Sequence, residues 1–191
     1  MARLHKVEDP ASHIRNAAIE LIAKHGIDKF SARVLAKKVK YSHGTIFKYF
    51  KNIDELMIRI NTETLVKLRD NLNEIKKDEI AGLNKLIHAA QSYLEFVEEN
   101  LHLWGCVMDA SLKGNKEVRR LYDAELDKLM AVVAEMVKPH LRKNQDIEVM
   151  TNLLWAGLQG IYQISRRESS GVSPALKQKK LAQDLVNELF G

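Results

Sequence analysis

The chain has 191 residues, of which 46% are hydrophobic and 29% are charged, and its formal net charge is +5. This length allows one large domain, or one small domain and one larger one. Three prolines and nine glycines are too few for a many-turned β fold. The lone cysteine excludes an internal disulfide and suits a reducing cytosol. Because no signal peptide and no apolar run of about 18 residues stand out, we expect a cytoplasmic protein without a membrane span.

The charge is unevenly distributed along the chain. Residues 1–53 contain eleven Lys and Arg and four Asp and Glu, a balance of +7, so the remaining residues sum to −2. A basic N-terminal quarter on a nearly neutral body is typical of a chain that binds a polyanion at one end. Basic surface helices that only aid solubility are the alternative interpretation.

The first predicted helix runs from Pro10 to about residue 25. Asp9 can accept hydrogen bonds as its N-cap, and proline is favoured at the first helical position. Apolar residues then recur at the spacing of an amphipathic helix. Gly26 follows where a C-terminal cap with positive φ is wanted.

Two short helices are expected next, over residues 32–39 and about 43–50. Ser31 and Ser42 are their N-cap candidates, and only residues 40 and 41 lie between the first of these helices and the cap Ser42. Two short helices joined by a tight turn and packed on a longer helix form a helix-turn-helix, whose second helix enters the major groove of DNA. The pattern therefore predicts a three-helix DNA-binding domain over residues 1–53.

The same stretch resembles the N-terminal signature of the TetR family of transcriptional regulators. The matching residues are Arg15, Ala17, Ala18, Gly26, Ser31, Leu35, Ala36, the run Ser42-His43-Gly44-Thr45-Ile46-Phe47-Lys48-Tyr49-Phe50, and Leu56. Three positions depart from the family: Lys40 replaces the usual glycine of the turn, Phe47 replaces tyrosine, and Ile53 replaces lysine. If residue 40 is left-handed, a lysine there costs roughly 1 kcal/mol.

The motif and the resemblance together define the candidate DNA contacts. They comprise the two caps, the turn and the recognition helix: Ser31, Arg33, Lys40, Tyr41, Ser42, His43, Gly44, Thr45, Phe47, Lys48 and Tyr49. Phe47 has no hydroxyl that could reach a phosphate. Each of these residues also has a purely structural interpretation, since Ser31 and Ser42 cap helices with or without DNA and Tyr41 could fill the core.

The rest of the chain, residues 54–191, keeps a helical pattern and predicts a larger all-α domain. Asn52 and Glu55 form a capping box for a fourth helix that reaches about residue 75 and connects the two domains. Further helices are expected over 80–98, 101–112, 116–137 and 146–167. Ser173 and Pro174 start a last helix.

The last two predicted helices have more apolar surface than one subunit can bury. Residues 153–164 are apolar on nearly all faces, and a helix of this kind must be buried on all faces. We therefore expect a homodimer through a four-helix interface, as the resemblance also implies. The candidate interface residues are Leu154, Gly157, Ile161, Leu181, Leu185 and Leu189.

Large or adaptable side chains gather on the helices that TetR-type proteins place around an effector cavity. They are Phe96, His102, Trp104, Cys106, Met108, Trp155, Gln159 and Tyr162. Apolar walls with a few polar groups suit a lipophilic or aromatic small molecule, although such residues at helical spacing are more often core. His102 and Cys106 lack further ligands for a metal site, and we expect no metal and no cofactor.

The resemblance implies a repressor that leaves a palindromic operator when a small-molecule effector binds. Two other classes stay open at this point. An enzyme is one, although no phosphate loop, nucleophile elbow or zinc motif is found. A helical interaction or lipid-carrying protein is the other, and its function would survive replacement of Thr45 and Lys48.

Overall fold

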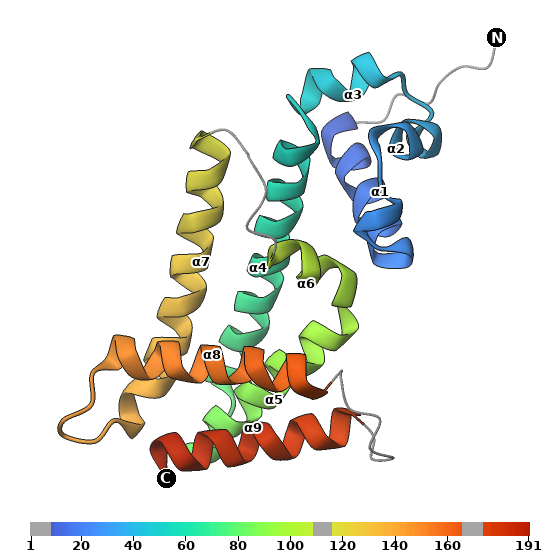
Figure 1. The fold of residues 1–191 in the computed structure, drawn as a ribbon. Coiled ribbons are helices and arrows are strands. Elements are labelled where there is room, and N and C mark those ends of the chain that lie inside the picture. Colours follow the sequence, from blue (N-terminus) through green and yellow to red (C-terminus); the bar gives the residue numbers. More distant parts are fainter. Residues whose placement is uncertain (1–8, 109–115, 166–173) are drawn as a thin grey trace. The chain divides into compact units, whose positions relative to one another are not determined.

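The computed structural model describes residues 9–108, 116–165 and 174–191 of the chain. These residues form nine α-helices, which are α1 (Pro10–His25), α2 (Ala32–Val39), α3 (His43–Tyr49), α4 (Ile53–Lys77), α5 (Leu83–Glu99), α6 (Leu101–Val107), α7 (Lys116–Val137), α8 (Ile147–Ser165) and α9 (Pro174–Phe190). Short 3-10 helices, η1 (Ile27–Lys29) and η2 (Lys138–His140), follow α1 and α7 (Figure 1). No strand occurs in these ranges, so the predicted all-α class is confirmed.

The chain divides into two compact units, and the division falls within α4. The first unit contains residues 1–64 and 100–124, and the second contains 65–99 and 125–191. The first unit therefore includes α6 and the start of α7 in addition to the N-terminal helices. The domain boundary at residue 53 remains a prediction from the sequence.

The core of the first unit lies between α1, α2, α3, the first half of α4, and α6. It is built from buried side chains that recur at helical spacing: Ile14, Ala18, Ile22, Leu35, Val39, Ile46, Phe50, Leu56, Ile60, Leu103 and Cys106. In the first helix this spacing agrees with the amphipathic pattern expected from the sequence. The contribution of α6, which packs against α1, was not predicted.

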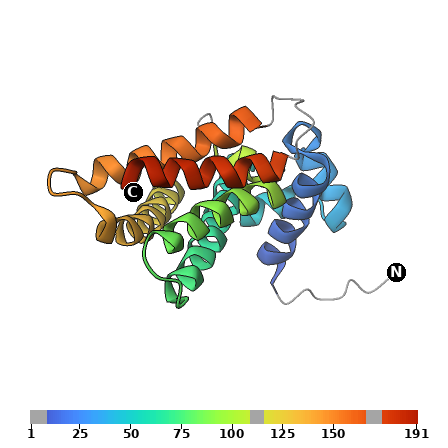
Figure 2. The same ribbon diagram turned by 90° about the horizontal axis from the view of Figure 1, so that it is seen from below.

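The second unit contains α5, α8 and α9 packed against one another. α5 and α8 are the main neighbours of α9, and α8 and α9 run side by side in both ribbon views (Figure 2). Tyr93 on α5 meets Trp155 on α8, with ring centroids 5.2 Å apart. None of the helices in the described ranges is long and apolar enough to cross a membrane.

Helix boundaries follow the sequence closely where caps are present. Asp9 caps α1 as predicted, accepting hydrogen bonds from the backbone N–H groups of Ala11 (3.0 Å) and Ser12 (3.2 Å). At α4, Asn52 Oδ1 accepts from the N–H of Glu55 at 2.8 Å, while the Glu55 carboxylate accepts from Lys51 instead of Asn52.

Two boundaries differ from the prediction. The helix expected from residue 80 begins at Leu83, because Gly82 has a φ of 62° and residues 78–82 form the connection from α4. The helix expected over 101–112 ends at Val107, since Met108 is its C-cap and lies in a turn, and 109–115 lie outside the described residues. The proposed cap Ser173 also lies outside them.

Candidate nucleic-acid interface and effector site

The start of α2 is fixed by a side-chain cap. Ser31 has extended backbone angles, and its Oγ accepts a hydrogen bond from the N–H of Val34 at 3.3 Å. The cap leaves the first-turn amides at the exposed end of α2 with the Arg33 side chain beside them, and an N-terminal helix end of this kind attracts phosphate. Arg33 is exposed, as a phosphate contact requires.

The turn between α2 and α3 depends on an unusual backbone conformation. Lys40 has a φ of 56° and a ψ of 35°, the left-handed region, and it is the single non-glycine residue with positive φ in the described ranges. Its N–H donates to the carbonyl of Ala36, which closes the end of α2. The condition considered from the sequence, a left-handed residue 40, is therefore met. The conformation directs the chain into α3 within two residues.

α3 begins at a second serine cap. Ser42 Oγ accepts from the N–H of Thr45 at 3.1 Å, and the two hydroxyls share a hydrogen bond of 2.9 Å. When Ser42 is the donor in that pair, the Thr45 hydroxyl is free to donate to a phosphate. The Ser42 cap therefore fixes the start of α3 and also holds the Thr45 hydroxyl, a candidate phosphate contact.

One side of α3 is buried and the other carries the candidate base contacts. Ile46 is fully buried, and Phe50 follows at the end of the helix. His43, Gly44, Phe47, Lys48 and Tyr49 are exposed. Helical spacing thus presents the predicted recognition residues on an accessible surface.

Tyr41 in the turn is partly buried against the core of the first unit. Its ring meets His13 of α1 edge-on, with centroids 5.8 Å apart. The sequence left core packing and DNA contact as alternatives for this residue. The packing accounts for the ring, and its contact with DNA stays a prediction.

These features define a helix-turn-helix DNA-binding domain: a left-handed tight turn, two capped short helices and an exposed second helix, on a basic segment of the chain. Residues 14–60 match the family described as bacterial regulatory proteins, tetR family. This N-terminal segment is therefore similar to the DNA-binding segment of TetR-family transcriptional regulators.

A curated relative and several solved structures resemble this chain. Over 73 residues it is 30% identical to the fatty acid metabolism regulator protein of Bacillus subtilis (strain 168), and this alignment spans 38% of each chain. The fatty acid degradation regulator FadR from Bacillus halodurans has a TM-score of 0.70 at 19% identity, with 95% of this chain and 97% of that chain covered. FadR from Bacillus subtilis in complex with stearoyl-CoA has a TM-score of 0.70 at 18% identity, covering 92% of this chain and 97% of that chain. At these identities the structural likeness shows the fold.

The predicted effector residues are divided between the two compact units. His102, Trp104, Cys106 and Met108 belong to the first, and Phe96, Trp155, Gln159 and Tyr162 belong to the second. Within the second unit, Phe96 and Tyr162 are buried and Gln159 is partly buried. A common cavity for the eight residues remains a prediction.

Cys106 lies in the core of the DNA-binding unit. It is 3% exposed, and its thiol donates to the carbonyl of His102 at 3.2 Å. Its own carbonyl accepts a 2.7 Å hydrogen bond from the Nδ2 of Asn61, a buried residue of α4. This placement matches an inert, structural thiol. No group of three potential metal ligands occurs in the part of the chain that the structure describes.

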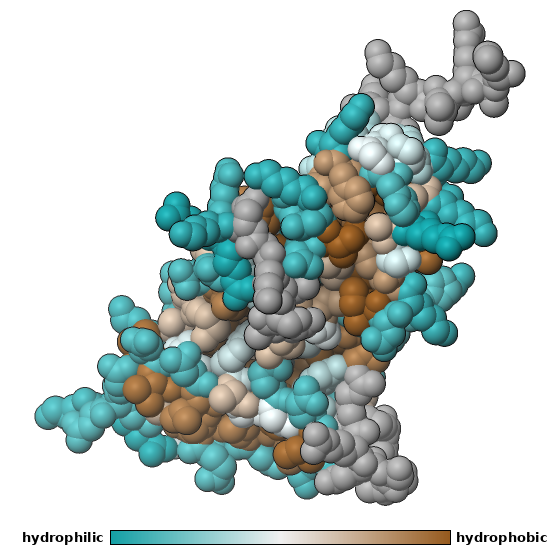
Figure 3. All heavy atoms as spheres, turned by 45° about the horizontal axis from the view of Figure 1, so that its top comes forward, coloured by the Kyte–Doolittle hydropathy of each residue, from teal (hydrophilic) through white to brown (hydrophobic). Residues whose placement is uncertain are grey.

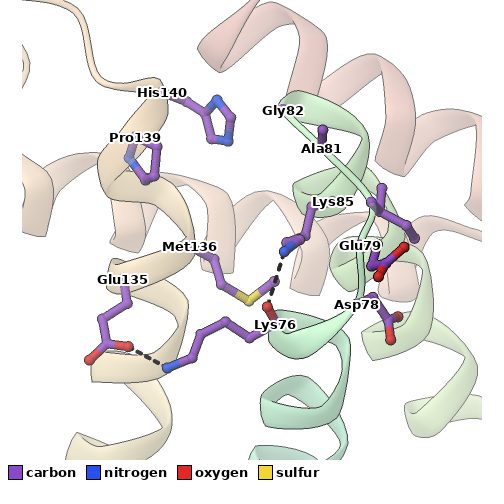
Figure 4. A pocket seen from close by; sticks show the side chains of 11 residues that line it. Lys76, Asp78, Glu79, Ala81, Gly82, Lys85, Glu135, Met136, Pro139 and His140 are labelled. Carbon is purple, nitrogen blue, oxygen red and sulfur yellow. Dashed lines mark hydrogen bonds and ion pairs between the residues drawn. The ribbon is translucent and has the colours of Figure 1, made fainter.

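The second unit has a surface groove that lies away from the effector residues predicted from the sequence. Its volume is about 510 Å³, and residues from the end of α4, the α4–α5 connection, α7 and η2 line it (Figure 4). Lys76 pairs with Glu135, which lowers the pKa of that carboxyl, and the Nζ of Lys85 donates to the carbonyl of Lys76 at 3.0 Å. None of the predicted effector residues lines the groove, which is formed largely by connecting segments that the helical pattern could not place.

The predicted interface residues divide between buried and partly exposed positions. Leu154 is 2% exposed, so it packs inside its own protomer instead of on a free face. Gly157 lies against Leu185 of α9 within the chain. Ile161, Leu181, Leu185 and Leu189 are partly exposed.

The exposed apolar side chains of α8 are ones that the prediction missed. Val149, Leu153 and Ile164 are each about half exposed, and Ala156 and Gly160 lie between them at helical spacing. These five residues, here called the α8 stripe, lie on one helix face because they are three or four residues apart. Figure 3 shows hydrophobic residues gathered in a band on the surface of the second unit. The fully apolar pattern predicted such a surplus but could not say which face would carry it.

Proposed function

We propose that this protein is a homodimeric repressor that binds a palindromic operator and releases it when a lipophilic effector binds to the helical domain of residues 54–191. The observation that carries the proposal is the exposed face of α3, which two capped helices and a left-handed turn present to solvent. One such helix reads one half-site, so a dimer reads two half-sites about one DNA turn apart, roughly 34–36 Å. Binding of this kind takes place in the cytoplasm and needs no catalytic step.

The α8 stripe supports the dimer. Val149, Leu153 and Ile164 expose apolar surface along a whole helix, which is the surface that a second copy of the same helix can cover. α9 lies beside α8 and carries another exposed leucine, Leu176. Two such helix pairs complete a four-helix interface.

The effector is proposed to be a fatty acyl-CoA. The support is the similarity to a fatty acid metabolism regulator and to solved FadR structures in complex with stearoyl-CoA and lauroyl-CoA. α4 passes from the first unit into the second, so a change at its C-terminal half can be transmitted to the recognition helix. A coupling of about 1–3 kcal/mol is enough for a 5–150-fold change in operator affinity.

Selection of duplexes from a random DNA pool by the purified protein tests the DNA-binding part of the proposal. We expect a palindrome with half-sites one turn apart, bound with steep salt dependence. The double variant Thr45→Ala, Lys48→Ala serves as the control and loses the selected duplex while it keeps the helical fold. Recovery of no sequence, with equal weak binding to every duplex, contradicts the repressor.

The effector part has its own test. Stearoyl-CoA or lauroyl-CoA is added to the complex of protein and selected duplex, with CoA alone and the free fatty acid as matched controls. Release by the thioesters alone supports an acyl-CoA effector. Unchanged operator affinity at saturating thioester contradicts it without affecting the assignment of DNA binding.

A further inference from the structure

The outer face of α3 carries an aromatic ring that has no polar group. Phe47 is 40% exposed, whereas the neighbouring Ile46 is fully buried, so the ring points away from the domain core. His43, one turn earlier, meets the ring edge-on with centroids 6.5 Å apart and planes at 78°. This contact restricts where the ring can lie on the helix surface.

Next to the ring, at Gly44, α3 carries no side chain that would keep DNA away from the helix. A Cβ added at Gly44 would meet only the Ser42 Oγ, at 3.8 Å, so the space beside Phe47 is open. Gly44 and Phe47 are three residues apart and therefore share a face. Lys48 follows, exposed and able to reach the backbone. A base edge can thus approach the ring closely.

The major groove offers an apolar ring one favourable partner. The edges of the bases present hydrogen-bond donors and acceptors there, and thymine adds the C5-methyl group. A phenyl ring placed on a donor or acceptor removes its water without replacing the lost hydrogen bond, which is unfavourable. Contact with a methyl group removes apolar surface from water on both sides.

We propose that Phe47 reads the 5-methyl group of one thymine in each operator half-site. This inference rests on the proposed function, because it requires α3 in the major groove. It assigns base specificity to a residue that cannot contact a phosphate through a hydroxyl. The ligand group is the methyl of a 5-methylpyrimidine, so 5-methylcytosine fits the same contact.

Exchange of thymine for deoxyuridine tests the contact directly. The selected duplex is resynthesised with each half-site thymine replaced in turn, symmetrically in both halves, which removes one methyl and keeps the base pairing. We expect one position at which affinity falls about fourfold for each half-site, or roughly 15-fold for both, the factor expected from one buried methyl. Other thymines should change affinity less than twofold.

Variants connect that position to Phe47. Phe47→Ala binds the thymine and the deoxyuridine duplex equally at that position, because the group that senses the methyl is gone. Lys48→Ala is the matched control on the same exposed face and weakens both duplexes by the same factor. A thermal unfolding curve of Phe47→Ala checks the fold, which a half-exposed side chain should leave intact.

The possible outcomes distinguish failure of the Phe47 contact from failure of the proposed repressor function. A selected palindrome without a methyl-sensitive thymine, or discrimination that survives in Phe47→Ala, overturns the inference and leaves the repressor in place. Recovery of no preferred duplex overturns the proposed function itself. Two further duplexes carry cytosine or 5-methylcytosine in place of the sensitive thymine. Tighter binding of the 5-methylcytosine duplex than of the cytosine duplex further supports the assignment.

Discussion

Single residues determine how the recognition helix is presented, and Lys40 is the clearest example. Its backbone is left-handed, a conformation in which the Cβ of an L-residue crowds the following carbonyl oxygen. Glycine avoids this crowding and is the usual residue of the family at this turn. The retained lysine adds a positive charge between α2 and α3, at the edge of the proposed interface.

Replacement of Lys40 by glycine should separate these two effects. We expect Lys40→Gly to raise the free energy of unfolding by about 1 kcal/mol, since the strain at this position is removed. Operator affinity should fall by a similar factor at every sequence, because a phosphate contact carries no base information. Chemical denaturation and titration of the selected duplex measure the two quantities. Lys40→Ala is the control, because it removes the charge and keeps the strain. Equal stability of the two variants contradicts the argument.

Asp9 shows a pH-dependent effect at the start of α1. Hydrogen bonds from Ser12, first through its side chain and then through its backbone N–H, hold the pKa of the Asp9 carboxyl below its usual range. A group whose pKa is lower in the folded state stabilises the fold above its unfolded pKa, and this stabilisation is lost as the pH falls through the folded pKa.

Comparison with Asp9→Asn isolates that contribution, because asparagine is an equally good cap without the charge. The wild type should be the more stable of the two at pH 6, and the difference should shrink as the pH falls below about 4. Thermal unfolding midpoints from pH 6 to pH 2.5 provide the measurement. A difference that stays constant over this range rules out the carboxylate as its source.

At the level of elements, the sequence determined the helices whose ends are marked by caps. Asp9, Ser31 and Ser42 each cap the helix predicted from them, because a cap is a local interaction between residues two or three apart. The start of α5 was missed, since Ile80 continues the apolar spacing although it lies in the connection before Gly82. Local patterns therefore predicted the two short helices that carry the candidate interface, whereas the contacts of their individual residues with DNA stay predictions.

The sequence pattern could not show which apolar residues tertiary packing buries inside the protomer. Cys106 was a candidate for the effector site or for a buried, inert thiol, and the packing of α6 on α1 places it in the core of the DNA-binding unit. Leu154 was assigned to the interface, but α8 is apolar on several faces and buries this one in its own protomer. Periodicity shows that a face is apolar, and only the fold shows what covers it.

The close packing of α8 on α9 predicts how one added Cβ atom at Gly157 changes the free energy of unfolding. A Cβ at Gly157 would lie 2.6 Å from Cδ2 and 2.9 Å from Cδ1 of Leu185, so Gly157→Ala forces this side chain to move. Overpacking of this kind costs typically about 1–3 kcal/mol, against about 1 kcal/mol gained in helix propensity. We expect Gly157→Ala to lower the free energy of unfolding by about 1 kcal/mol.

Removal of the Leu185 side chain should make Gly157→Ala stabilising instead of destabilising. In the Leu185→Ala background, Gly157→Ala should raise the free energy of unfolding by about 1 kcal/mol, because only the propensity gain remains. Gly105→Ala in α6, where an added Cβ meets nothing within 4 Å, is the matched control and should be stabilising alone. Denaturant unfolding of the four variants completes the cycle. The same sign of the Gly157→Ala effect in both backgrounds disproves the clash.

At the scale of the whole molecule, the charge asymmetry and the α8 stripe make separate contributions. The basic N-terminal quarter attracts DNA of any sequence, which gives one chain a weak and salt-dependent affinity. The stripe is proposed to join two such chains, so that each complex engages two half-sites at once. Linking two binding modules raises the overall affinity by about 10²–10⁴ without any new contact to DNA.

A charge placed on the stripe should therefore remove the operator affinity from a distance. Leu153 is 48% exposed in the protomer, so Leu153→Lys should leave the helical content of the chain unchanged. A buried lysine without a partner opposes association, and light scattering should give a particle of 21.8 kDa, the mass of one chain, instead of twice that mass. Affinity for the full palindrome should fall on the order of 100-fold or more, while affinity for an isolated half-site stays the same. Asn84→Lys adds the same charge at an exposed position of α5, on neither α8 nor α9, and should remain a dimer. If Leu153→Lys is still dimeric and still binds the palindrome, the two copies associate through another surface, and the spacing of the half-sites must be explained by that surface instead.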